Sequence, residues 1–273
     1  MRFLNSDYRD CRNDSRFVDA VRMYREGDID TALILFRKSA ESGNPVAQYT
    51  LGSILLNRGD VSAVKWIRTA AEQGYPEAQF QMGNIHYLGT VGKPSPETAL
   101  QYYRMAAENG SPKAQNQLGL MYLNGEGTKK SDEEAFTWFR RSAENGYAGA
   151  QFNLASMYEL GQSVPVSYPD AVKWYTKAAE QGLSEAQYCL GVLHYLGKAG
   201  PQDSSKAAEW YAKAAEQDHH DAIYNLGLLY IDGDGVERDY GKAEELLRKA
   251  AKMGVTDAEE ALKMITRIRE TDP

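Results

Sequence analysis

The densest group of residues that could bind a metal is Asp-His-His-Asp at residues 218–221. Imidazole nitrogens and carboxylate oxygens are common zinc ligands, so His219 and His220 with their flanking aspartates could in principle supply a site. Adjacent histidines in a turn usually face different ways, however, and the pattern therefore favours a solvated turn. We expect no metal and no cofactor.

Other candidates for chemistry are weaker still. DGDGVERD at residues 232–239 begins like a calcium-binding loop but lacks the Gly and the Glu that such a loop needs at its sixth and twelfth positions. The sequence signatures of phosphate-binding loops, serine nucleophiles and zinc proteases are absent. We therefore predict no catalytic residue and expect a protein that is not an enzyme.

Composition and charge narrow the class of partner. The 273 residues are 25% charged and 42% hydrophobic, which is typical of a globular chain. The net charge of −7 is spread along the sequence, which argues against a nucleic acid or an anionic membrane surface as the main partner. No segment approaches the roughly 20 apolar residues of a membrane helix.

Cellular location can also be inferred. The first residues, MRFLNSDYRDCRNDSRF, do not resemble a signal peptide. Cys11 and Cys189 occupy unrelated positions, which fits a reducing compartment. We expect a cytoplasmic monomer without membrane insertion.

A pattern that returns every 36 residues organises nearly the whole chain. WYTKAAEQGLSEAQYCLG at residues 174–191 returns as WYAKAAEQDHHDAIYNLG at residues 210–227. We take the Ala of the Ala-Gln step, or its equivalent, as the origin of each copy. Successive origins are separated by one interval of 31 residues and then five of 36: Ala47, Ala78, Ala114, Ala150, Ala186, Ala222 and Ala258. A fixed period of this length is typical of a solenoid of stacked units.

Each copy predicts two amphipathic helices. Helix B precedes the origin and carries two alanines and a pair of large apolar residues on one stripe. It should end at a Gly such as Gly182, because Gly adopts the left-handed C-cap conformation without a steric clash. Helix A carries the origin, then an aliphatic residue and a small residue, such as Leu118 and Gly119. A recurring Gly inside a helix indicates that a neighbouring helix packs unusually close.

Neighbouring helix pairs must stack, because a single pair cannot cover its own apolar stripe. The last helix, residues 258–270, has Lys263 in place of the packing Gly and so reads as an end cap. Residues 16–28 resemble helix A of a further, degenerate copy. His86 and His194 occur where other copies have Tyr, which predicts partly buried packing residues.

The pattern Ala...WY-x-KAAEQG-x3-AQ-x2-LG-x2-Y...G resembles Sel1-like repeats, relatives of tetratricopeptide repeats with a longer loop between helices A and B. The resemblance covers roughly residues 16–270. It implies an all-α fold: a right-handed α-solenoid of about seven stacked antiparallel hairpins plus a C-terminal capping helix. We expect one solenoid domain over residues 15–270, after a polar tail of residues 1–14.

The resemblance also implies a function. In tetratricopeptide-like folds helix A lines a concave groove, with positions one before and two, six, nine and ten after the origin pointing inward. Aromatic residues at such positions suit a peptide or protein partner, and asparagines could bond its backbone. The predicted groove residues are Tyr49, Phe80, Asn84, Tyr87, Asn116, Asn124, Phe152, Tyr188, Tyr195 and Tyr224. Acidic rim residues, Glu77, Glu185, Asp221 and Asp257, would favour a partner with some positive charge.

Three functions stay open at this point. The first is a non-catalytic scaffold or adaptor that holds a peptide or protein segment in the groove. The second is binding or hydrolysis of a small cell-wall or β-lactam type molecule, as suggested for a secreted, disulfide-bonded Sel1-like subfamily whose paired cysteines this chain lacks. The third is a regulatory subunit that docks by its convex face. Aromatic residues two positions after the origin could instead pack sideways on a neighbouring helix.

Overall fold

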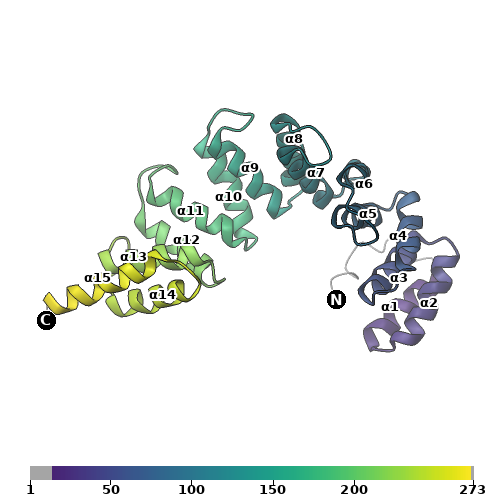
Figure 1. Ribbon diagram of the computed structural model, residues 1–273, viewed down its shortest axis with the longest axis horizontal. Helices are drawn as coiled ribbons and strands as arrows, with labels where there is room; N and C mark the ends of the chain where they lie inside the picture. Colours follow the sequence, from purple (N-terminus) through teal and green to yellow (C-terminus); the bar gives the residue numbers. More distant parts are fainter. Residues whose placement is uncertain (1–13, 272–273) are drawn as a thin grey trace. The chain divides into compact units, whose positions relative to one another are not determined.

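The computed structural model describes residues 14–271, in which all regular structure is α-helical (Figure 1). The helices are α1 (Ser15–Glu26), α2 (Ile29–Glu41), α3 (Pro45–Asn57), α4 (Ala63–Glu72), α5 (Pro76–Leu88), α6 (Pro96–Glu108), α7 (Pro112–Asn124), α8 (Asp132–Glu144), α9 (Ala148–Leu160), α10 (Tyr168–Glu180), α11 (Ser184–Tyr195), α12 (Ser204–Ala215), α13 (His220–Asp232), α14 (Tyr240–Lys252) and α15 (Asp257–Thr271). Odd-numbered helices correspond to helix A and even-numbered helices to helix B. The predicted tail lies outside the described residues, apart from Asp14.

The chain divides into two compact units, which we describe one at a time. Unit 1 ends at Ser142 and unit 2 begins at Ala143, so the boundary falls within α8. In unit 1 the helices pack as the pairs α1–α2, α3–α4 and α5–α6, and each pair packs on the next helix along the chain. In unit 2 the pairs are α9–α10, α11–α12 and α13–α14, and α15 packs on α14. The predicted all-α fold of stacked helix pairs is therefore confirmed.

The origin alanines form the centre of this packing. All seven are fully buried, with an exposed fraction of 0%. The small residue five positions later lies where helix B comes closest. A Cβ atom on Gly83 would lie 2.5 Å from the ring of Tyr103, and one on Gly191 would lie 2.5 Å from the ring of Tyr211. The aromatic ring thus occupies the space that the glycine leaves, as the sequence predicts.

The predicted helix-B ends are also confirmed. The glycines four residues before the origins have φ between 84° and 95°: Gly43, Gly74, Gly110, Gly146, Gly182 and Gly254. Asp218 replaces Gly in one copy and also adopts the left-handed region, with φ of 61°. Asp tolerates this conformation better than most residues. Its carboxylate pairs with Nζ of Lys249 at 2.6 Å.

A buried glutamine near the start of helix A is hydrogen-bonded to the end of the preceding helix B. The sequence pattern does not predict this contact. In five copies its Nε2 donates to the carbonyl of an alanine in the last turn of helix B at 3.0–3.2 Å: Gln48 to Ala40, Gln79 to Ala71, Gln115 to Ala107, Gln151 to Ala143 and Gln187 to Ala179. In several copies its Oε1 accepts from an amide at the end of the next helix B, as from Gln217 to Gln187 at 2.9 Å. The glutamine adds a second hydrogen bond to a helix-terminal carbonyl that otherwise accepts only from the turn after helix B, as from the Gly182 amide to Ala179 at 3.0 Å.

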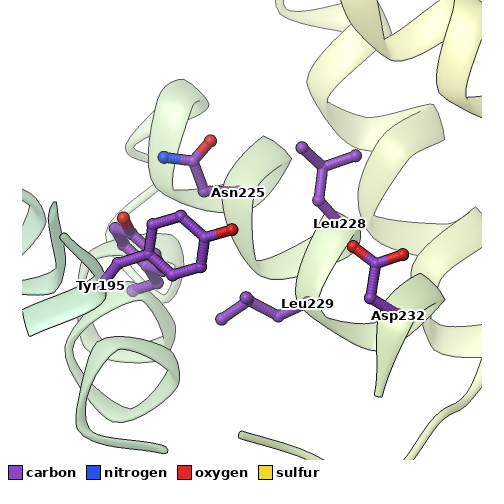
Figure 2. Close-up of a pocket in the computed structure, with 6 residues that line it drawn as sticks. Tyr195, Asn225, Leu228, Leu229 and Asp232 are labelled. Atoms are coloured by element: carbon purple, nitrogen blue, oxygen red, sulfur yellow. The ribbon is translucent and has the colours of Figure 1, made fainter. Parts of the chain in front are cut away.

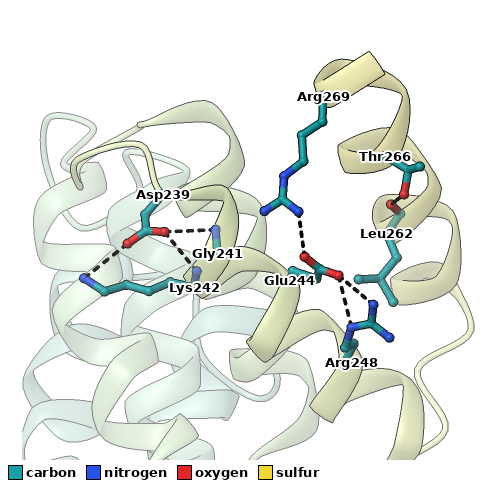
Figure 3. Close-up of polar contacts among 8 residues, drawn as sticks. All are labelled: Asp239, Gly241, Lys242, Glu244, Arg248, Leu262, Thr266 and Arg269. Carbon is teal, nitrogen blue, oxygen red and sulfur yellow. Dashed lines mark hydrogen bonds and ion pairs between the residues drawn. The ribbon is translucent and has the colours of Figure 1, made fainter. Parts of the chain in front are cut away.

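Both ends of the described chain carry specific contacts. Asp14 caps α1 by accepting from the Phe17 amide at 3.3 Å, and it also accepts from Asn44 Nδ2 at 3.0 Å, so it belongs to the first hairpin rather than to the tail. At the other end, Glu244 on α14 accepts from Arg269 on α15 at 3.0 Å (Figure 3). Lys263, at the repeat position of the packing Gly, is exposed on α15. None of the described helices combines the length and apolar character needed to cross a membrane.

Candidate partner-binding surface

A pocket of about 120 Å³ lies among α11, α12 and α13 of unit 2. It is lined by Tyr195, Tyr211, Asn225, Leu228, Leu229 and Asp232. Figure 2 shows Tyr195 and Asp232 at opposite ends of the pocket, with Leu228 and Leu229 between them. A protein cavity of about 150 Å³ holds one benzene molecule. The pocket is therefore sized for a single side chain.

Local helix geometry explains why these residues meet. The other three lining residues of α13 lie three, four and seven positions after Asn225, which places all four on one helical stripe. Tyr211 reaches the pocket from helix B because Gly191 has no side chain in its path. Tyr195 ends α11, and its side chain is 38% exposed. The same close crossing that stacks the hairpins thus also forms one wall of the pocket.

The polar groups of the pocket fall into two kinds. Burial raises the pKa of Tyr188, and the neighbouring Asn225 side chain acts in the opposite direction on both Tyr188 and Tyr211. Burial raises the pKa of Tyr211 far above its ordinary value, so its hydroxyl stays neutral. The exposed Asp232 carboxylate, by contrast, has no hydrogen bond or ion pair to any residue in the described part of the chain. The pocket therefore has a neutral tyrosine hydroxyl in its lining and an exposed, unpaired carboxylate at its edge.

A second depression of about 800 Å³ lies between α13 and α15. It is lined by Tyr224, Leu228, Asp257, Glu260, Ala261, Lys263, Met264 and Arg267. Leu228 belongs to both pockets, which makes them one surface. Burial raises the pKa of Tyr224, and the charges of Asp257 and Glu260 raise it further. We call the residues of the two pockets together the α11–α13–α15 surface.

Two of the predicted groove residues in unit 2 lie on this surface, namely Tyr195 and Tyr224. Tyr188 lies behind it, with its ring 5.9 Å from that of Tyr211 and 4.6 Å from that of His219. Phe152 is half-buried and contacts Tyr175 at a ring separation of 5.5 Å. Neither Tyr188 nor Phe152 lines either pocket.

The six predicted residues in unit 1 are engaged mainly with their own neighbours, and none lines either pocket. Tyr49 contacts Tyr75 and Phe80 contacts Tyr103, with ring separations of 5.4 and 5.5 Å. Asn84 accepts from the Tyr103 hydroxyl at 2.8 Å, and Asn116 is buried. Tyr87 and Asn124 both donate to Glu126.

Several surface residues escaped the sequence analysis although their repeat positions were known. Leu228 and Asp232 stand six and ten positions after Ala222, and Glu260, Met264 and Arg267 stand two, six and nine after Ala258. These are the positions expected to point inward. The prediction covers only aromatic residues and asparagines, and it therefore misses the leucine, the methionine and the charged residues at these positions.

The Asp-His-His-Asp turn has a structural role. His219 Nδ1 accepts a hydrogen bond from the Ala222 amide at 3.3 Å and so caps α13. His220 Nδ1 lies 2.9 Å from the Asp221 carboxylate. The two imidazole rings lie with their centroids 5.6 Å apart, and their Nδ1 atoms have different partners. Capping α13 and stacking on Tyr188 hold His219 beside its neighbour.

The other histidine expectation concerned His86. This residue is half-buried and its ring stacks on Tyr102, with centroids 5.5 Å apart and planes 8° from parallel. Burial lowers the pKa of His86, which favours the neutral ring. The contact fits the predicted packing role.

The fold and its exposed A-helix side chains define a helical repeat protein of the kind that commonly takes part in protein–protein interaction. The chain belongs to the Sel1 repeat family. The family's repeat matches residues 22–44, 45–75, 76–111, 112–147, 148–183, 184–219 and 220–255. These seven matches confirm the resemblance deduced from the repeated letters.

Solved structures support the assignment. The chain is 35% identical to c5321 of uropathogenic Escherichia coli, a protective antigen with an SLR fold, at a TM-score of 0.84 over 94% of this chain. It spans only 57% of that protein. It is 34% identical to a Sel1 repeat protein from Oxalobacter formigenes, at a TM-score of 0.78 over 92% of this chain and 75% of that one.

A more distant structure shares the fold alone. The immunity protein PA5088 from Pseudomonas aeruginosa is 21% identical, at a TM-score of 0.50 over 73% of this chain and 81% of that one. No curated protein matches the sequence.

Proposed function

We propose that this protein is a non-catalytic adaptor that holds a segment of a protein or peptide partner against its A helices. The α11–α13–α15 surface is the principal contact. The observation that carries the proposal is the single-side-chain pocket, which has the exposed ring of Tyr195 at one end and the unpaired carboxylate of Asp232 at the other. Interfaces concentrate their binding energy in such pockets, where a few aromatic and apolar side chains receive an anchor residue.

The proposal extends to the A helices of the other hairpins. Tyr49, Phe80 and Phe152 occupy the repeat position of Tyr224 and keep part of their rings exposed. Within each unit these rings would add apolar contact area with the partner, and each would keep its packing against a neighbouring tyrosine. Packing against a neighbour and binding a partner are compatible, because each ring has two faces.

The electrostatics of the chain support binding rather than catalysis. Catalytic carboxylates are typically found in clefts with strongly perturbed pKa values. Here the carboxylates with lowered pKa values cap helices and turns or form ion pairs, and none lines either pocket: Asp14, Asp60, Asp203, Asp239 and Glu244. The α14 cap by Asp239, which accepts from the amides of Gly241 and Lys242, is drawn in Figure 3.

Affinity capture followed by quantitative mass spectrometry tests the proposal. The bait carrying Tyr195→Ser and Leu228→Ser should lose the partners that the wild type captures from the native lysate. A matched bait carrying Lys173→Ser and Glu209→Ser changes two exposed residues of helices B and should keep them. Circular dichroism and melting establish that both variants are folded. Loss of partners with the helix-B variant alone would reject the proposal and favour docking by the opposite face.

A further inference from the structure

We infer that the pocket between Tyr195 and Asp232 selects one basic side chain, Lys or Arg, of the partner segment. The inference rests on the proposed function and gives it a chemical specificity. It follows from three properties of the pocket: its size, its apolar walls and the charge at its rim.

Size and walls favour a long side chain with an apolar stem. The pocket measures about 120 Å³, and Leu228, Leu229 and the ring of Tyr211 supply apolar lining. Lys and Arg bury their methylene stems along apolar surface while the charged end stays in water. Asp232 is exposed at the end of the pocket away from Tyr195, so a stem lying along the leucines would bring its charge to the carboxylate.

The charge at the rim selects a cation. The lining includes one carboxylate and no cationic side chain. Asp232 lies in the last turn of α13, where the negative end of the helix dipole adds to the attraction for a cation. Arg238 is also near, but its guanidinium donates to the Asp232 carbonyl at 3.2 Å and leaves the carboxylate unpaired.

The aromatic end of the pocket accommodates the same ligand. A cation over a tyrosine face is attracted by the ring quadrupole, by roughly 0.5–1 kcal/mol at exposed sites. The Tyr195 ring is exposed enough to take this role for an arginine bound in the opposite direction. An acidic side chain would be repelled by Asp232, and an aliphatic one would leave that carboxylate without a counter-ion.

Four fluorescent nonapeptide pools test the inference by anisotropy titration of the full chain. The pools share randomised flanks and differ in a fixed central residue: Lys, Arg, norleucine or Glu. Norleucine keeps the stem of Lys and removes its charge. The Lys and Arg pools should bind about threefold to fivefold more tightly than the norleucine pool at low salt, as for an exposed ion pair. The difference should shrink in 0.5 M salt, because exposed charges are screened.

Two matched variants locate the effect. Asp232→Asn should remove the preference for Lys over norleucine while leaving norleucine binding unchanged. Asp234→Asn alters a neighbouring acidic residue outside the pocket and should keep the preference. Equal binding of the Lys and norleucine pools, an unchanged preference in Asp232→Asn, or no binding of any pool would each overturn the inference. The adaptor function would still stand if the captured partners remain sensitive to Tyr195→Ser and Leu228→Ser.

Discussion

A Cβ atom on Gly119 of α7 would lie 2.6 Å from Cε1 of Phe139 on α8, which is closer than non-bonded carbons can approach. The ring of Phe139 is fully buried against this backbone. The same contact joins Gly83 to Tyr103 and Gly191 to Tyr211. In these three hairpins the spacing between helices A and B is therefore set by an aromatic ring that packs on the glycine backbone, whereas Ile67 and Leu247 take this place over Gly52 and Gly227.

Gly119→Leu should strongly destabilise unit 1. Overpacking in a core typically costs about 1–3 kcal/mol, and here the loss should exceed that range because the helix backbones would have to separate. Urea unfolding followed by circular dichroism measures the change. Lys263→Leu is the control, because Lys263 has the same repeat position on α15 and is exposed. A near-unchanged unfolding midpoint for Gly119→Leu would show that the α7–α8 contact can relax.

Gln187→Ala should cost about 0.5–1.5 kcal/mol, because it removes one of two hydrogen bonds to a buried carbonyl and leaves the one from the Gly182 amide at 3.0 Å. Gln187 Nε2 donates to the Ala179 carbonyl at 3.1 Å, and Gln187 is only 6% exposed. Gln217→Ala removes only the bond to Gln187 Oε1 from an exposed donor and should cost less. Thermal melting of both variants makes the comparison. Equal losses would mean that the Ala179 carbonyl finds water when the glutamine is absent.

Stability should fall with decreasing pH in a manner that depends on His219. Burial holds the pKa of this imidazole below its ordinary value of 6.5, and nearby His220 acts in the same direction, whereas Asp221 and Glu185 oppose it. A protonated Nδ1 also cannot accept the hydrogen bond that caps α13. The unfolded chain thus binds the proton more readily. The contribution of neutral His219 to folding stability is therefore fully present above pH 6.5, and it is lost as the pH falls towards the lower pKa of the folded state.

His219→Asn provides the test of this dependence. Asn caps helices well and does not titrate, so its stability at pH 7.5 should be close to that of the wild type. Between pH 7 and pH 5 the variant should lose less stability than the wild type in urea titrations. The lowered pKa values of His86 and His194 act in the same direction in both proteins and cancel in the comparison. Identical pH profiles would contradict the role of His219.

Helix α15 should be held by its apolar face rather than by its ion pair. Ile265 is 2% exposed, and Ile265→Ala should cost about 2–5 kcal/mol. The Arg269–Glu244 pair is exposed, and Arg269→Ala should leave the melting temperature almost unchanged. Hydrogen exchange of the α15 amides gives a local measure for both variants. Faster exchange in Arg269→Ala than in Ile265→Ala would reverse this assignment.

Much of the architecture could be predicted from spacing alone. The origin alanines, the glycines at the ends of helix B and the small residue inside helix A all have the predicted burial or backbone conformation. Each of these features depends on contacts within one hairpin or between neighbours, and such contacts repeat with the sequence. The buried glutamines repeat as well, but a polar residue beside the origin does not reveal which carbonyl it will reach.

The helix pairs, their order and their mode of stacking follow from the amino-acid sequence, because a period of 36 residues repeats the same local packing in each copy. The position of the pocket, by contrast, depends on how side chains from different helices meet in the folded protein. The pocket needs Tyr195, Tyr211 and Asp232 from three helices at one place, and no other copy has an acidic residue at the repeat position of Asp232. Its shape and free charge depend on which side chains meet, and the period carries no information about that.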